Sequence, residues 1–223
     1  MGNSPSAPHG HSSGSRGGRS ASLDGHGAGH RKPKLHENFL FLGKFFRHGT
    51  KIASVWPSSP VLARATIKEI DWESVKVVVE LGAGTGPITD QIIRRLKPQT
   101  TFVAIERDGD FVKILQRRFT GLKNVEIVHS DVRELDGVLK ARKIKHVDAF
   151  VSGLATPTLP PQVRNRMLAS VRKYMVEDGV FSNITEIPFI YWNYYRKFFK
   201  DVSFDFVMRN MPPGGVYHCR ACK

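Results

Sequence analysis

The sequence has little cysteine, and it lacks any apolar run of the ~20 residues that a membrane-spanning helix needs. Its two cysteines, Cys219 and Cys222, form a C-x-x-C pair, but no second pair exists to complete a four-cysteine zinc site. Successive side chains of a strand point to opposite faces, so we interpret the pair as incidental thiols of a reducing cytosol. No metal is expected.

Acidic residues are also scarce. Lys and Arg number 34 against 20 Asp and Glu, which leaves a formal charge of +14. A surplus of this size favours an anionic partner, either nucleic acid or an anionic membrane surface.

The N-terminal 34 residues lack the side chains of a core. Between Met1 and His30, Leu23 is the only large apolar residue after the initiator, and Gly, Ser and His dominate. Such a segment buries too little surface to offset its ordering entropy, so residues 1–34 are predicted to be disordered. They also lack the apolar stretch of a secretory signal. The remaining residues, roughly 190, suffice for one domain with a full core.

From residue 75 onward, short apolar runs alternate with amphipathic ones. The expected strands are 76–81, 101–106, 124–131, 147–154, 179–186, 202–210 and 215–221, and the expected helices are 88–96, 110–119 and 160–175. Continuous apolar strands between such helices indicate a parallel sheet covered on both faces, while MPPGG joins the last two strands into an antiparallel hairpin. We therefore predict a doubly wound α/β fold with a mostly parallel, seven-stranded sheet. Ligands of such sheets bind beyond the carboxyl ends of the strands.

The first expected strand ends in VVVELGAGTGPIT. The segment has the pattern acid-x-G-x-G-x-G, with Glu80 ahead of the glycines, and Pro87 stands where a dinucleotide fingerprint needs its last glycine. This pattern resembles the first motif of class I S-adenosylmethionine-dependent methyltransferases. Glu106 ends the second strand and Asp131 the third, where the resemblance implies acceptors for the ribose hydroxyls and the adenine amino group. The alternative is that both acids cap the helices that follow them.

The cofactor expected from this resemblance is S-adenosylmethionine. The residues that it implies around the cofactor are Glu80, Gly82, Ala83, Gly84, Thr85, Gly86, Glu106, Arg107, Asp131 and Val132. A sulfonium methyl donor needs no nucleophile or metal from the protein, so the chemistry is one of positioning.

The fourth strand bears on the acceptor. Amine methyltransferases of nucleic acids carry an N/D-P-P-Y-like motif there, whose aromatic ring stacks on a flipped base. The sequence instead reads SGLATPTLP over 152–160, with no aromatic residue.

Three segments are similar to the bacterial phospholipid N-methyltransferase family: this SGL, the upstream KIASVWPSSPVLAR (51–64) and the terminal RNMPPGGVYHCRA (209–221). The resemblance covers residues 39–221 and departs from the family at Ala155 and in the His-rich tail. It implies methylation of phosphatidylethanolamine or of ornithine lipid by a domain spanning 71–223.

The same resemblance implies roles by position. Pro57, Ser58 and Ser59 would approach the methionine end of the cofactor; Ser152, Gly153 and Leu154 would lie beside the transferable methyl; Arg209 and Asn210 would face the lipid headgroup. As alternatives, Ser59 is a helix N-cap ahead of Pro60, and Arg209 is a solvated side chain.

The segment FLFLGKFFRHGTK (39–51) places apolar and basic side chains on opposite faces of a helix. This pattern is typical of a helix that lies in a membrane interface, although a helix packed on its own sheet would show it too. We expect residues 35–70 to form an amphipathic, membrane-contacting helical segment. The expected membrane contacts are Phe41, Leu42, Lys44, Phe45, Phe46, Arg47 and Lys51.

The aromatic run FIYWNYYRKFF places Tyr191, Tyr194 and Tyr195 on one helical face, where their rings could hold a methylated ammonium. The alternative is that these rings cover the sheet. No His–Asp pair stands out as a base, so desolvation is expected to lower the pKa of the acceptor amine.

The sequence thus predicts a cytoplasmic lipid N-methyltransferase, peripheral on the inner face of the cytoplasmic membrane, with anionic lipids and an aminolipid as partners and no nucleic acid. One alternative is an enzyme like the rRNA adenine N6-dimethyltransferases, favoured by the charge, the ELGAGTGPIT motif and HENFL (36–40). Another is a non-catalytic protein that binds a cofactor or a membrane.

Overall fold

The computed structural model describes residues 59–187, 189–210 and 213–223. The expected membrane contacts between Phe41 and Lys51, the expected tail 1–34, and Pro57 and Ser58 lie outside these residues. The strands are β1 (Val77–Leu81), β2 (Thr101–Glu106), β3 (Val125–His129), β4 (Val147–Ser152), β5 (Met175–Thr185), β6 (Phe199–Val207) and β7 (Gly214–Cys222). The α-helices are α2 (Pro60–Thr66), α3 (Pro87–Ile93), α4 (Gly109–Arg118), α5 (Leu135–Ala141), α6 (Pro161–Tyr174) and α7 (Trp192–Tyr195), and the short 3-10 turns are η1 (Val132–Glu134) and η2 (Thr156–Thr158).

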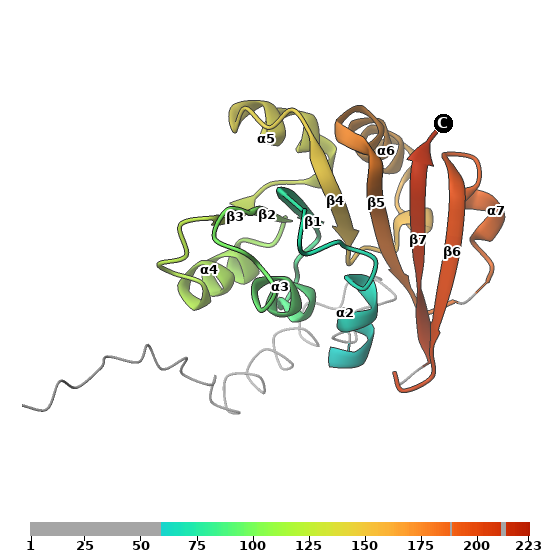
Figure 1. Cartoon of the computed structure of the whole chain (residues 1–223), viewed down its shortest axis with the longest axis horizontal. Helices are drawn as coiled ribbons and strands as arrows, with labels where there is room; N and C mark the ends of the chain where they lie inside the picture. Colours follow the sequence, from blue (N-terminus) through green and yellow to red (C-terminus); the bar gives the residue numbers. More distant parts are fainter. Residues whose placement is uncertain (1–58, 188, 211–212) are drawn as a thin grey trace, which may run out of the picture. The chain divides into compact units, whose positions relative to one another are not determined.

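The described strands form one seven-stranded sheet in the order β3-β2-β1-β4-β5-β7-β6 (Figure 1). The first five strands pair in parallel, and β7 pairs antiparallel with both β5 and β6. The predicted doubly wound α/β fold and its terminal hairpin are confirmed. The direction of strand order reverses between β1 and β4, so the carboxyl ends of these two strands are the expected ligand position.

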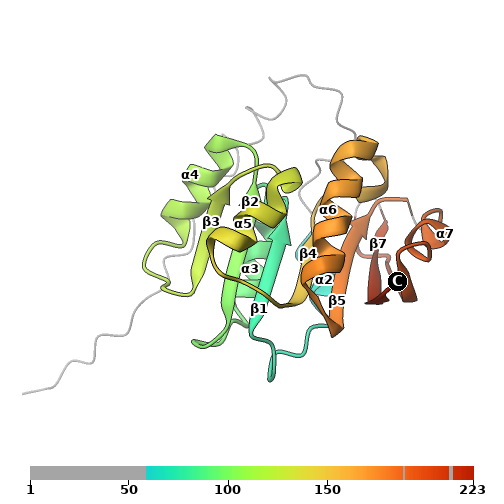
Figure 2. The same ribbon diagram turned by 90° about the horizontal axis from the view of Figure 1, so that it is seen from above.

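The strands are buried on both faces because successive side chains enter two different cores. Val79, Leu81 and Phe150 pack with residues of α5 and α6, whereas Val78, Ala104 and others pack with residues of α2, α3 and α4. Figure 2 shows α5 and α6 in front of the sheet and α3 behind it. This double cover explains why the parallel strands are continuously apolar.

Helix α2 packs on the second of these cores. Its Ala63 and the following Ile67 and Ile70 are buried there, and Leu62 joins Val207 and Val216 in a smaller cluster. Residues 59–70, which were expected to belong to a membrane-contacting segment, therefore pack on the same sheet as the residues beyond 71.

Strand β5 begins at Met175, four residues earlier than expected, and the preceding helix ends at Tyr174. The pairing with β4 shifts in register between Val147 and Ala149, which marks a bulge. A Cβ on Gly179 would lie 2.9 Å from the carbonyl oxygen of Val176, so the glycine permits this close approach. The acidic and glycine residues of the bulge resemble a turn in the sequence, which is why the strand appeared to start later.

Cys219 is buried in the core beside α6 and α7, and Cys222 is half-buried; both thiols are free. Within the described ranges, no helix combines the length and the apolarity needed to cross a membrane.

Candidate functional site

The loops that follow β1 and β4 touch at the point where strand order reverses. The amide of Gly153 donates to the carbonyl oxygen of Leu81 at 3.0 Å, and a Cβ on Gly153 would lie only 2.7 Å from the carbonyl oxygen of Gly82. Gly82 itself has φ of +76°, and a Cβ there would overlap the side chain of Leu154. Both positions therefore require glycine, and the predicted cofactor and acceptor motifs lie side by side.

The glycine loop is fixed on its other side by β2. The amides of Gly82 and Ala83 both donate to the carbonyl oxygen of Ile105, at 2.9 and 3.2 Å. The guanidinium of Arg118, on α4, donates to the carbonyl oxygens of Thr85 and Gly86 at 3.2 Å each. The loop is thus held in shape by neighbours before any ligand is considered.

The Glu106 carboxylate stands at the carboxyl end of β2. Its Oε2 accepts from the amide of Gly84 at 2.7 Å, and its Oε1 accepts from the amides of Arg107 and Asp108 at 2.8 Å each. The predicted ribose acceptor therefore also holds its own loop, but it does not cap the following helix as in the alternative interpretation, because the N-cap of α4 is Asp108. A carboxylate oxygen has more than one acceptor direction, so these bonds leave capacity for hydroxyl groups.

Gly84 presents an open surface beside this carboxylate. It has φ of +54°, and a Cβ built on it meets no atom within 4 Å. The backbone here is accessible to a ligand.

Glu80 is fully buried beneath the loop. Its Oε2 accepts from Oγ1 of Thr89 at 2.7 Å, whereas its Oε1 has no hydrogen-bond partner among the described residues. Burial raises the pKa of Glu80 to about 8, against the opposing effect of the Thr89 hydroxyl. A positive charge near this carboxyl would favour its ionised form.

Asp131 follows β3 and caps the turn that begins at Val132. Its Oδ1 accepts from the amide of Arg133 at 2.9 Å, and its carboxylate forms an ion pair with the Arg133 guanidinium. Burial acts to raise the pKa of Asp131, but the hydrogen bonds and charge of Arg133 outweigh it and lower that pKa overall. Val132 is buried in the core. Asp131 thus stays ionised at the same edge of the sheet as Glu106.

Ser152 ends β4 with a buried hydroxyl, 3.3 Å from Oγ1 of Thr156 and accepting from the amide of Leu154 at 3.3 Å. These contacts help to fix the shape of the SGL loop. On the neighbouring strand, Asn183 pairs in register with Ser152 and donates from Nδ2 to the carbonyl oxygen of Leu154 at 3.0 Å. Oδ1 of Asn183 is buried and has no partner among the described residues.

Sequence reasoning missed Asn183, Thr89 and Arg118. A signal for Asn183 exists, because an amide near the end of the apolar run GVFSNITE calls for a buried partner. Thr89 and Arg118 become visible only when α3 and α4 are folded against the loop.

Ser59 is the N-cap of α2, since its Oγ accepts from the amide of Leu62 at 3.2 Å. The Ser59 amide in turn donates to Oδ1 of Asn210, at 3.2 Å, which lies just after β6. Asn210 is buried, so it ties α2 to the hairpin rather than facing a headgroup as expected. Arg209 is exposed.

The three predicted tyrosines differ in their surroundings. Tyr195 is 1 % exposed, with its ring between those of Phe181 and Tyr217. It has no free face for a cation, which favours the alternative that it covers the sheet. Tyr194 is partly exposed, and its ring already has the guanidinium carbon of Arg164 at 5.4 Å from its centroid. Tyr191 is also partly exposed, and its amide donates to the Tyr217 hydroxyl at 3.1 Å.

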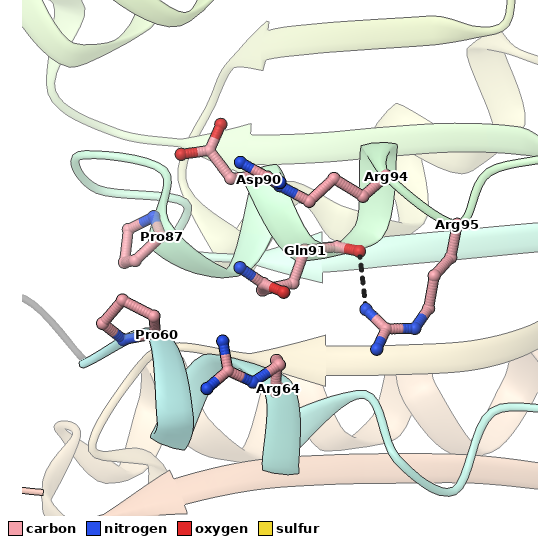
Figure 3. Close-up of a pocket in the computed structure, with 7 residues that line it drawn as sticks. All are labelled: Pro60, Arg64, Pro87, Asp90, Gln91, Arg94 and Arg95. Atoms are coloured by element: carbon pink, nitrogen blue, oxygen red, sulfur yellow. Dashed lines mark hydrogen bonds between the residues drawn. The ribbon is translucent and has the colours of Figure 1, made fainter. Parts of the chain in front are cut away.

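A cavity of about 600 Å³ lies between α2 and α3. Figure 3 shows Arg64 extending from α2 toward Gln91 of α3, with Pro60 and Pro87 together at one end. Arg94 and Arg95 also line the cavity, and Asp90 is the acidic residue of the lining. Of these lining residues, Pro87 directly follows the glycine loop. Three arginines against one aspartate suit an anion.

The described residues fit S-adenosylmethionine. Glu80 offers a buried, unpartnered carboxyl oxygen to a cationic ligand, Glu106 offers acceptors for a diol, and Gly84 leaves the space that a side chain would fill. No group of three or more potential metal ligands occurs among the described residues.

Comparison with known proteins finds methyltransferases. The chain is 48% identical over 189 residues to an ornithine lipid N-methyltransferase of Singulisphaera acidiphila, covering 85% of this chain and 98% of that protein. The family model described as ribosomal RNA adenine dimethylase matches residues 55–155. A ribosomal RNA small subunit methyltransferase A of Shouchella clausii is 31% identical over 118 residues, which is 50% of this chain and 39% of that protein.

Solved structures share the fold at low identity. Human methyltransferase-like protein 13 in complex with SAH matches with a TM-score of 0.54 at 16% identity, over 73% of this chain and 79% of that one. A T. thermophilus 16S rRNA methyltransferase in complex with AdoMet and guanosine matches with a TM-score of 0.53 at 21% identity, over 76% and 44%. Both support the class I methyltransferase fold.

Proposed function

We propose that the methyl acceptor is the amine of an ornithine lipid or of phosphatidylethanolamine, because this chain belongs to the family of the ornithine lipid N-methyltransferases. It is accordingly an S-adenosylmethionine-dependent N-methyltransferase that acts on an aminolipid. The observation that carries the proposal is the length of the likeness, which covers nearly all of the Singulisphaera protein at 48% identity.

The match to the RNA adenine dimethylase family model is confined to the first part of the described fold. The family model of the adenine dimethylases stops at residue 155, just after SGL. The parts of the chain beyond it, β5 with Asn183 and the hairpin β6–β7, are therefore outside that match. This favours a shared cofactor half and a different acceptor.

For the cofactor side, we assign Glu80 to the charged end of S-adenosylmethionine, Glu106 to the ribose hydroxyls and Asp131 to the adenine. Bound S-adenosylmethionine supplies a methyl group on a positively charged sulfur. The chain contributes a loop already held by Ile105 and Arg118, so little ordering is needed on binding.

For the acceptor side, Gly153 and Leu154 lie beside the glycine loop and so beside the expected methyl position. The free Oδ1 of Asn183 can accept a hydrogen from the amine and thereby orient its lone pair. An amide cannot take the proton itself. The ammonium loses its proton to water before attack, because desolvation at the site disfavours its charged form.

The remaining assignments concern the membrane. We assign residues 39–51 to contact with anionic lipid and the enzyme to the inner face of the cytoplasmic membrane, as a peripheral protein. The excess of basic residues supports an anionic surface. Nucleic acid is not a partner in this proposal.

The test is a transfer assay with methyl-labelled S-adenosylmethionine. Three acceptors are offered separately: vesicles that contain ornithine lipid, vesicles that contain phosphatidylethanolamine, and 16S rRNA. Label is expected in one or both lipids and absent from RNA, and it should vanish with Glu106→Ala. Label in RNA alone would overturn the proposal.

A further inference from the structure

Exposed apolar side chains gather at one place on the described part of the molecule. Among the described residues six large apolar side chains are exposed, and five of them follow β5 or lie at the end of β6. These five, here named the apolar tip, are Ile187, Phe189, Ile190, Phe206 and Met208. The sixth, Leu122, precedes β3 and is thus at the opposite edge of the sheet.

The apolar tip protrudes. Met208 is 76 % exposed, Ile190 is 68 % exposed and Phe189 is 61 % exposed. Exposed apolar side chains scattered singly need no explanation, but a contiguous group marks an interaction surface.

Phe189 gives the apolar tip a defined structure. Its ring centroid lies 4.8 Å from that of Phe204 and 6.1 Å from that of Phe206, so the rings of two segments pack together. Its φ of +67° is a conformation that a phenylalanine rarely adopts. Such strain persists where the surrounding structure enforces it, and it concentrates at functional positions.

The apolar tip lies at the carboxyl edge of the sheet. Strand β6 runs in the same direction as β5, because both are antiparallel to β7, and β5 is parallel to β4. The ends of β5 and β6 therefore lie at the same edge as Gly82 and Gly153, where the acceptor must arrive.

One basic side chain adjoins the apolar tip at this edge. Arg209 is exposed next to Met208, and one exposed acid, Glu186, stands beside Ile187. The arginine-lined cavity between α2 and α3 begins at the same edge with Pro60 and Pro87. Protruding apolar side chains beside an exposed arginine, on a chain with a formal charge of +14, match the interfacial region of an anionic bilayer.

We propose that the apolar tip inserts into the surface of an anionic lipid bilayer and turns the carboxyl edge of the sheet toward the membrane. The proposal deepens the proposed function and relies on it for the choice of a lipid partner. It adds a contact surface that is distinct from residues 39–51.

The first test measures binding of the full chain to vesicles of phosphatidylglycerol and phosphatidylethanolamine by cosedimentation. The double variant Ile190→Ser with Met208→Ser should lose about tenfold in partition coefficient, because two apolar side chains no longer leave water. The matched control, Leu122→Ser, removes the exposed apolar residue of the opposite edge and should bind like the wild type. Equal binding of the double variant and the wild type would refute the insertion.

The second test detects insertion directly, whatever other segment also binds. Vesicles with brominated acyl chains quench tryptophan that enters the bilayer. Ile190→Trp should be quenched well beyond the wild-type background, and Leu122→Trp should not. Equal quenching of the two variants would overturn the proposal, as would a lipid-independent dimer that the double variant abolishes.

Neither test requires turnover. If the apolar tip inserts but no lipid becomes labelled, the proposed methyl acceptor is wrong and the membrane contact stands. If lipid becomes labelled but the apolar tip does not insert, only the proposed membrane contact is wrong.

Discussion

The amide of Gly84 lies 2.7 Å from Oε2 of Glu106, so the end of β2 is bonded directly to the middle of the glycine loop. The same carboxylate accepts two further hydrogen bonds, from the amides of Arg107 and Asp108. The shape of the loop therefore depends on one side chain, which is also the one that we assign to the ribose hydroxyls.

Replacing Glu106 with alanine should damage both properties. Three amides lose their acceptor, which should lower the free energy of unfolding by about 1–3 kcal/mol, and the Kd for S-adenosylmethionine should rise at least about tenfold. Urea unfolding and calorimetry measure the two effects. Glu126→Ala is the control, because this exposed acid of β3 forms an ion pair with Arg142 at the surface, away from the glycine loop. Wild-type affinity in Glu106→Ala would contradict the assignment.

Glu80 should make the folded protein less stable as the pH rises. Burial raises its pKa to about 8 from 4.5. A raised pKa contributes stability that is fully present below pH 4.5 and is lost as the pH rises through 8. Glu80→Gln stays neutral, so the difference in unfolding free energy between wild type and variant should shift against the wild type from pH 5 to pH 9. A difference that is constant with pH would show that Glu80 is not buried as described.

The same carboxyl should couple proton release to cofactor binding. A bound sulfonium favours ionised Glu80, so the affinity for S-adenosylmethionine should increase with pH up to about 8 in the wild type. Calorimetry in buffers of different ionisation enthalpy counts the released protons. Glu80→Gln should release fewer, and identical proton release in both proteins would exclude Glu80 as the source.

Much of this site could be predicted because its signals are local. Gly82, Glu106 and Asp131 each stand where an apolar strand meets the next turn, and the alternation of strands and helices places all three at one edge. The partners that come from elsewhere in the fold could not be predicted, as with Arg118 on the glycine loop or Asn183 on the SGL loop.

Tyr195 and Asn210 show that the position of a residue in the sequence does not predict which side chains pack around it. Helical periodicity places Tyr195 on the same face as Tyr191, yet the packing of Phe181 and Tyr217 encloses its ring. The family resemblance implied a headgroup contact for Asn210, but its side chain accepts from the amide of Ser59, 151 residues away in the sequence.

Gly153→Ala should push the SGL loop after β4 away from the glycine loop after β1. The added Cβ would lie 2.7 Å from the carbonyl oxygen of Gly82, a backbone atom that cannot move aside cheaply. We expect a stability loss of about 1–3 kcal/mol and at least about a tenfold fall in kcat/KM. Gly137→Ala, in α5 with no atom near the new Cβ, should instead stabilise by about 0.5–1 kcal/mol. Full activity of Gly153→Ala would mean that the loops need not touch.

Substitutions of the neighbours Arg209 and Asn210 should change different properties: the KM for lipid in the first case and the stability in the second. Asn210→Ala removes the acceptor for the α2 cap and should cost about 1–2 kcal/mol of stability, whereas Asn210→Asp keeps an acceptor and should cost less. Arg209→Ala should leave stability within about 0.5 kcal/mol and raise KM for lipid in anionic vesicles. An unchanged KM together with a lowered melting temperature for Arg209→Ala would reverse the assignment.

The two thiols of the final strand have a practical consequence. Burial raises the pKa of both Cys219 and Cys222, so neither forms thiolate readily near neutral pH. A maleimide dye should therefore attach selectively to one cysteine engineered on the outside. The native chain is in this way already suited to single-site fluorescence labelling, without prior removal of its own sulfhydryls.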